Sequence, residues 1–120
     1  MGIFEVPVRI LSPDGSAQVE LSMLVDTGST FSLVPASTLR QLGIHEQVTV
    51  PVEYATGQGS SLPMGIAMME IDGFAGRLPM LVLFGDDSVR PLLGAHALEA
   101  FRLSVDPIRK VLSAGPALLM

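Results

Sequence analysis

The first part of the chain alternates apolar and other side chains in the manner of β-strands. Every second position is apolar in residues 4–10 and again in residues 19–23. Between these segments, Ser-Pro-Asp-Gly-Ser at 12–16 supplies the residue types that favour a tight turn. The pattern therefore predicts a β-hairpin, and its second strand leads directly to Asp26.

The remaining pattern also favours strands over helices. A helix of about six residues is predicted over 37–42, ending at Gly43, and another over 95–101. Pro51 indicates either an edge position or an irregularity in its strand. The segment 55–61 is predicted to be an exposed loop, and Asp72-Gly73 indicates a hairpin turn. Strands are predicted over 31–34, 48–54, 64–71, 78–84, 103–105 and 110–112. We expect an all-β domain with one or two short helices.

The composition of the chain excludes several classes of protein and of chemical site. The 120 residues suffice for one domain, 1–120, and hydrophobic residues make up 48% of them. The formal charge is -5 and the seven Lys and Arg are scattered, which argues against a nucleic-acid partner. The chain has no cysteine, so disulfides, thiolate metal sites and cysteine nucleophiles are excluded.

The N-terminal residues 1–5 lack the basic and apolar segments of a signal peptide, and Val6 stands where a myristoylation signal has Ser or Thr. The apolar run 78–84 is too short to span a bilayer. We therefore expect a cytoplasmic protein without a membrane segment, either as a whole gene product or as a domain of a longer precursor.

Asp26 is the main candidate for chemistry. It leaves an apolar strand and opens the turn Asp26-Thr27-Gly28-Ser29. A carboxylate in such surroundings either caps the turn through an Asx-type hydrogen bond or has its proton affinity adjusted for catalysis. The motif alone leaves both interpretations open.

Three elements in order resemble the retropepsin-like, or retroviral-type, aspartic proteases. Val25 to Ser29 is similar to their catalytic turn, and Tyr54-Ala55-Thr56-Gly57 to the tip of their flap. Leu92-Leu93-Gly94 is similar to the segment that crosses beneath the catalytic loop. The resemblance covers about residues 6–106 and implies a closed or partly open all-β barrel. Tyr54 departs from the retroviral flap, which usually has glycine and aliphatic residues there.

The resemblance also implies roles for individual residues. Asp26 would be catalytic, with Thr27 bonding across a dimer axis, Gly28 allowing a close backbone approach, and Ser29 donating its hydroxyl to Asp26. The flap residues Tyr54, Ala55, Thr56 and Gly57 would close over a peptide, although Tyr54 is alternatively a packed aromatic. Leu93 and Gly94 would support the loop. The expected pocket residues are Thr30, Phe31, Val89 and Leu92.

The sequence contains a single Asp-Thr/Ser-Gly motif. Aspartic proteases use two carboxylates that share one proton, because like charges at short range cannot both ionise. The second carboxylate must therefore come from another copy, so we expect a homodimer that hydrolyses extended peptides or proteins. No metal or organic cofactor is implied, since His45 and His96 have no supporting cluster.

Two other functions stay open at this stage. The same fold could serve as a dimerisation or peptide-binding module with little turnover, or as a protease active only within a larger precursor. The apolar residues of 106–120 are expected to form a terminal hairpin and tail. Either this segment lies at the dimer interface, or it is a remnant of a longer protein. Met64, Met68 and Met69 line an adaptable apolar surface or simply pack in the core.

Overall fold

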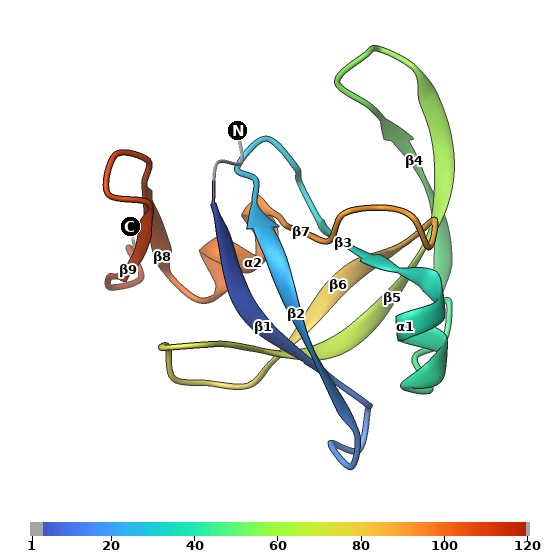
Figure 1. The fold of residues 1–120 in the computed structure, drawn as a ribbon, viewed down its shortest axis with the longest axis horizontal. Coiled ribbons are helices and arrows are strands. Elements are labelled where there is room, and N and C mark those ends of the chain that lie inside the picture. Colours follow the sequence, from blue (N-terminus) through green and yellow to red (C-terminus); the bar gives the residue numbers. More distant parts are fainter. Residues whose placement is uncertain (1–3, 120) are drawn as a thin grey trace.

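The computed structural model describes residues 4–119, and its strands form a sheet that closes on itself (Figure 1). The hydrogen-bonded order is β1-β2-β7-β3-β6-β5-β4, and β1 also pairs with β5, which closes six strands into a barrel. The strands of this sheet are β1 (Glu5–Leu11), β2 (Gln18–Val25), β3 (Ser32–Pro35), β4 (Val48–Glu53), β5 (Gly59–Ile71), β6 (Leu78–Gly85) and β7 (Leu92–Leu93). The predicted all-β class is confirmed.

The N-terminal hairpin follows the alternation in the sequence. β1 and β2 pair antiparallel from Glu5↔Leu24 to Leu11↔Gln18. Val8, Ile10 and Met23 are fully buried because the period of two turns them to the inside of the barrel. The predicted hairpin is confirmed, and its second strand ends at Val25, immediately before Asp26.

β7 is a two-residue strand that arrives from late in the chain. It lies between β2 and β3, parallel to β2 through Leu24↔Leu92 and Val25↔Leu93, and antiparallel to β3 through Leu33↔Leu92. The segments that enter and leave the Asp26 turn are therefore held apart by a third strand. No periodicity in residues 85–94 indicates this placement.

Two short helices flank the barrel, as predicted. α1 (Ala36–Gln41) buries Leu39, and the chain leaves it through Gly43, whose φ of 73° is accessible to glycine without strain. α2 (Ala95–Ala100) begins directly after Gly94 and buries Ala97 and Leu98. Each helix covers the core with one apolar face.

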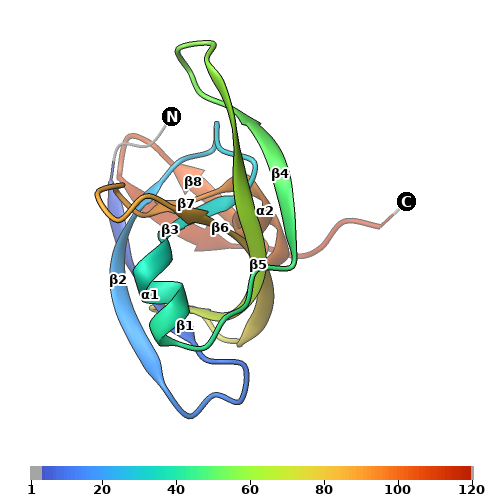
Figure 2. The same ribbon diagram turned by 90° about the vertical axis from the view of Figure 1, so that its right-hand side faces the viewer.

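The β4–β5 hairpin projects beyond the barrel (Figure 2). Among the described residues β4 pairs only with β5, from Val48↔Met64 to Glu53↔Gly59. Pro51 therefore lies in an edge strand, which is one of the two placements predicted for it. The prediction of a loop over 55–61 was wrong at its end, since β5 begins at Gly59. The residues there are small and polar and have a low propensity for strands. They adopt strand conformation because they pair with β4.

The methionines of the predicted apolar surface belong mostly to the core. Met64 and Met69 are buried, together with Met23 and Met80, and Met68 is half-buried. Of these, Met23, Met69 and Met80 belong to the hydrophobic core cluster, where flexible thioethers fill irregular space. The simpler of the two interpretations, ordinary packing, is the one that the structure supports.

The chain ends in a separate two-stranded sheet, β8 (Leu103–Asp106) and β9 (Val111–Ala114), as the terminal hairpin was predicted. Leu118 and Leu119 beyond it are about nine-tenths exposed. The expectations about residues 1–3 and Met120 lie outside the described residues. Between residues 4 and 119, none of the helices has the length and apolar character that crossing a membrane requires.

Candidate functional site

The Asp26 turn is held by backbone hydrogen bonds from both sides. The Asp26 N–H donates to the Leu93 carbonyl at 3.0 Å, and the Asp26 carbonyl accepts from the Ser29 N–H at 3.2 Å. The Gly28 N–H donates to the Asp26 Oδ1 at 3.0 Å. Asp26 is half-buried. The carboxylate is thus fixed in an Asx-type turn and still reaches the surface, so capping and catalysis are compatible at this residue.

Gly94 lets a second backbone segment pack against this turn. A Cβ at Gly94 would lie 2.5 Å from the Phe31 carbonyl oxygen and 2.9 Å from that of Ser29. The same Ser29 oxygen accepts a hydrogen bond from the Ala95 N–H at 2.7 Å. The Leu92-Leu93-Gly94 segment therefore supports the turn through its backbone, and a side chain at position 94 would separate the two.

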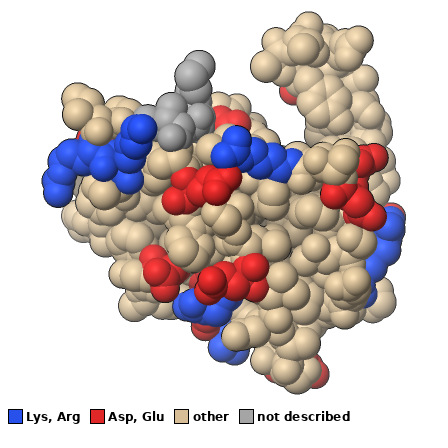
Figure 3. Space-filling view, viewed as in Figure 1, with Lys and Arg blue, Asp and Glu red and all other residues tan. Residues whose placement is uncertain are grey.

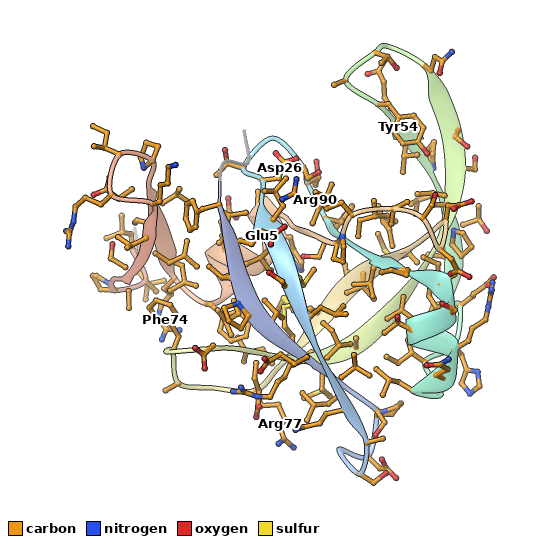
Figure 4. The ribbon with its side chains drawn as sticks, in the orientation of Figure 1. Glu5, Asp26, Tyr54, Phe74, Arg77 and Arg90 are labelled. Carbon is orange, nitrogen blue, oxygen red and sulfur yellow. The ribbon has the colours of Figure 1, made fainter. Side chains whose placement is uncertain are left out.

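A cavity of about 700 Å³ opens between the Asp26 turn and the β4–β5 hairpin. We refer to it as the cleft. Figure 3 shows the hairpin standing away from the body of the molecule, with a hollow beneath its tip. In Figure 4, Tyr54 on the hairpin and Asp26 on the turn lie at the two sides of this opening. The cleft is lined by Asp26, Gly28, Ser29, Thr30, Phe31, Leu33, Val50, Pro51, Val52, Glu53, Tyr54, Ala55, Leu62, Leu83 and Leu92.

The structure brings most of the predicted site residues to this cleft. The predicted residues that do not line it are Thr27, Thr56, Gly57, Val89, Leu93 and Gly94. Thr56 and Gly57 lie in the hairpin tip, where the Gly57 N–H donates to the Tyr54 carbonyl and Gly57 has a φ of 87°. Leu93 and Gly94 lie behind the turn that they support.

Thr27 lines a second, smaller hollow of about 340 Å³. His96 and Glu99 of α2 line this hollow, and Phe31 borders both it and the cleft. The Phe31 and His96 rings meet edge to face, with centroids 5.8 Å apart. Asp26 and Ser29 thus line the cleft, Thr27 lines the second hollow, and Gly28 and Thr30 line both.

The loop before β7, residues 86–91, contributes no residue to the lining of the cleft. Val89 covers Gly85, where an added Cβ would lie 2.8 Å from the Val89 Cγ2. The Ser88 hydroxyl and N–H donate to Asp86 and hold the pKa of that carboxyl below its ordinary value. Arg90 pairs with Glu5 on β1, as Figure 4 shows, and this hydrogen bond lowers the pKa of Glu5.

Sequence reasoning missed two groups of residues here. Ser32 is buried, and its hydroxyl oxygen accepts a hydrogen bond from the Gly94 N–H at 3.1 Å, tying β3 to the segment after β7. The other group is the apolar inner wall of the cleft, which Leu33, Val50, Leu62 and Leu83 help to form. The alternation of apolar residues predicts that these residues lie in strands. It does not predict that they share a cleft, because the cleft is formed by strands that are distant in sequence.

The chemistry available in the cleft is that of a carboxylate among apolar walls. Within residues 4–119, its carboxylic acids are Asp26 and Glu53, and no Lys, Arg or His lines it. Within residues 4–119 there is no group of three or more His, Cys, Asp or Glu side chains that could hold a metal ion. A carboxylate so placed can accept or deliver a proton at a bound, extended ligand.

Comparisons with known proteins agree with this geometry. The model of the family described as "gag-polyprotein putative aspartyl protease" matches residues 16–100, more than half of the chain. A search of the curated proteins found no significant match.

Two solved structures have a similar fold. The retroviral protease-like domain of Ddi1 from Leishmania major superposes with a TM-score of 0.58 at 16% identity, over 95% of this chain and 89% of that one. EIAV protease complexed with the inhibitor HBY-793 superposes with a TM-score of 0.54 at 18% identity, over 80% of this chain and 85% of that one. The family match shows that the chain belongs to the gag-polyprotein aspartyl protease family, and the two structures share its retropepsin-like fold.

Proposed function

We propose that this protein is an aspartic endopeptidase whose active site forms when two copies bring their Asp26 side chains together. The observation that carries the proposal is the position of Asp26 at the edge of a 700 Å³ cleft, fixed by Leu93 and Gly28. Retropepsin-like proteases are typically homodimers with peptide substrates. The single Asp-Thr-Gly in the chain supports the same arrangement.

The shape of the cleft suits an extended peptide. One of its walls is the edge strand β4, which pairs on one side only. A substrate segment can bind there in extended form, with its main chain bonded to backbone groups and its side chains in pockets. Phe31, Leu33 and Leu92 would then receive apolar side chains near the scissile bond.

Two adjacent Asp26 carboxylates would supply an acid and a base to the same reaction. Sharing one proton, the ionised member removes a proton from water, and the protonated member delivers one to the carbonyl oxygen of the peptide. The resulting diol collapses with transfer of a proton to the leaving amine. The hairpin tip around Tyr54 and Gly57 would cover the peptide and exclude bulk water.

The first test is the substitution Asp26→Asn, assayed on a mixed library of peptides between acidic and neutral pH. The wild type should cleave with a bell-shaped pH profile, since the pair works only with a single proton bound. Asp26→Asn should lower kcat/KM by about 10²–10⁴-fold, because an amide cannot exchange the proton.

Asp72→Asn is the matched control for this test. Asp72 lies in the loop after β5, away from the cleft, and Asn is equally suited to that turn. This variant should cleave as the wild type does. Equal background cleavage by the wild type and Asp26→Asn would overturn the proposed activity. Peptide binding without cleavage would then favour the alternative of a binding module.

A further inference from the structure

Most acidic side chains of this protein are already engaged by its own residues. Leaving Asp26 aside, every carboxylate except those of Glu53 and Glu99 has a hydrogen-bond or ion-pair partner between residues 4 and 119. Glu70, for example, binds Arg9 at 2.8 Å and Arg77 at 3.0 Å. Of the two exceptions, only Glu53 lines the cleft.

Glu53 is placed where a bound ligand can reach it. It is the last residue of β4, and its cross-strand neighbour is Gly59, which offers no side chain to pair with it. It is exposed, lies next to Tyr54 and is one of the residues that line the cleft, where the described part of the chain places no Lys, Arg or His. The carboxylate is therefore available to a cation that comes with the ligand.

The rest of the cleft strengthens this attraction. Its walls are mainly aliphatic and aromatic, and its carboxylates, among the described residues, are those of Asp26 and Glu53. Two acids between apolar walls focus a negative potential in the opening, which favours cations and repels acidic ligands. A peptide that ordered the hairpin over itself would displace water around Glu53 and reduce the screening of its charge.

On the basis of the proposed function, we infer that Glu53 is a specificity residue that selects peptides carrying Lys or Arg at a distance from the apolar residues of the scissile bond. Glu53 lies on β4, whereas Asp26 lies on the opposite turn, so the selected position is displaced from the bond itself. In a twofold dimer the two Glu53 side chains are symmetry-related. The preference must then occur at matching positions on both sides of the bond.

Peptide binding tests this inference separately from catalysis. Each fluorescent peptide has an apolar centre and a single Lys, Gln or Glu, and the position of this residue is varied stepwise on both sides of the centre. The full chain carrying Asp26→Asn is used, so that bound peptides are not cleaved. Fluorescence anisotropy measures the binding of each peptide. At the selected positions the Lys peptide should bind about two- to fivefold more tightly than the Gln peptide, the usual gain from an exposed ion pair. The Glu peptide should bind more weakly than both, and salt should reduce the difference.

Substitutions at position 53 assign the effect. In the Asp26→Asn protein, a second substitution Glu53→Gln should abolish the preference for the Lys peptide. Glu53→Lys in the same protein should reverse the preference in favour of the Glu peptide. Glu20→Gln, the same charge change on β2 outside the cleft, should leave it intact. A Lys preference that survives Glu53→Gln would overturn the inference, as would equal binding of the three peptides or no binding of any. Selective binding without hydrolysis by the wild-type protein would refute only the proposed protease activity.

Discussion

At the scale of single residues, the site depends on how closely two backbones approach. Gly94 places its backbone against the carbonyl groups of Ser29 and Phe31, and its N–H donates to the buried Ser32 hydroxyl. The contact is between main chains, so neither side can move away as a flexible side chain would. The absence of a side chain at position 94 is thus a structural requirement of the Asp26 turn.

Gly94→Ala should therefore destabilise the protein and disturb the turn. With the new Cβ 2.5 Å from the Phe31 oxygen, the free energy of unfolding should fall by about 1–3 kcal/mol, as overpacking usually costs. Chemical denaturation measures this change. Gly59→Ala is the matched control, since its Cβ would meet only the Val52 oxygen at 3.7 Å. An unchanged denaturation midpoint for Gly94→Ala would contradict the close approach.

At the scale of elements, the β4–β5 hairpin differs from the barrel in its support. The barrel strands are paired on both sides, whereas β4 pairs only with β5 and exposes most of its residues. Among the described residues, the hydrogen bonds that close its tip join Tyr54 to Gly57 and to Gln58. The hairpin can therefore open locally without unfolding of the barrel, which a cover over a substrate must be able to do.

Amide hydrogen exchange should show this difference directly. The amides of residues 48–58 should exchange faster than those of buried strand residues such as Met69 and Val82, because their opening requires only local loss of structure. NMR or mass spectrometry of the full chain gives both rates in one experiment. A saturating apolar peptide should slow exchange in 48–58 selectively. Equal protection of hairpin and barrel would rule out independent motion of the hairpin.

At the scale of the whole molecule, the described chain carries one Asp26 and one cleft. The second hollow, which includes Thr27 and Glu99, shares Gly28, Thr30 and Phe31 with the cleft. A second copy that packed there would lie directly beside the Asp26 turn. In the proposed dimer the active site lies at the interface itself, because the two Asp26 side chains have to meet there.

Mixing copies tests whether the site is shared. If wild-type protein is equilibrated with a tenfold excess of Asp26→Asn, most wild-type copies pair with the inactive variant, and activity should fall by about tenfold at random exchange. Dilution of the wild type alone should also lower its specific activity. Activity that is additive in the mixture and constant on dilution would show that one copy suffices.

The sequence by itself determined the local features of this protein. Alternation of apolar residues indicated the β1–β2 hairpin, Pro51 indicated an edge position or an irregularity in its strand, and the Asp26 turn followed from its residue types. These features depend on neighbours along the chain, so a pattern of a few residues carries them. The same locality misled the prediction at Gly59, whose strand conformation comes from pairing with Glu53.

Only the tertiary structure decided what surrounds Asp26. The insertion of β7 between β2 and β3 and the wall formed by Leu33, Leu62 and Leu83 join segments that are distant in sequence. Glu53 was an ordinary strand-end residue until pairing with β5 placed it over the same cleft. Such contacts depend on closure of the barrel, which packs all its strands together, and no short window of sequence encodes them.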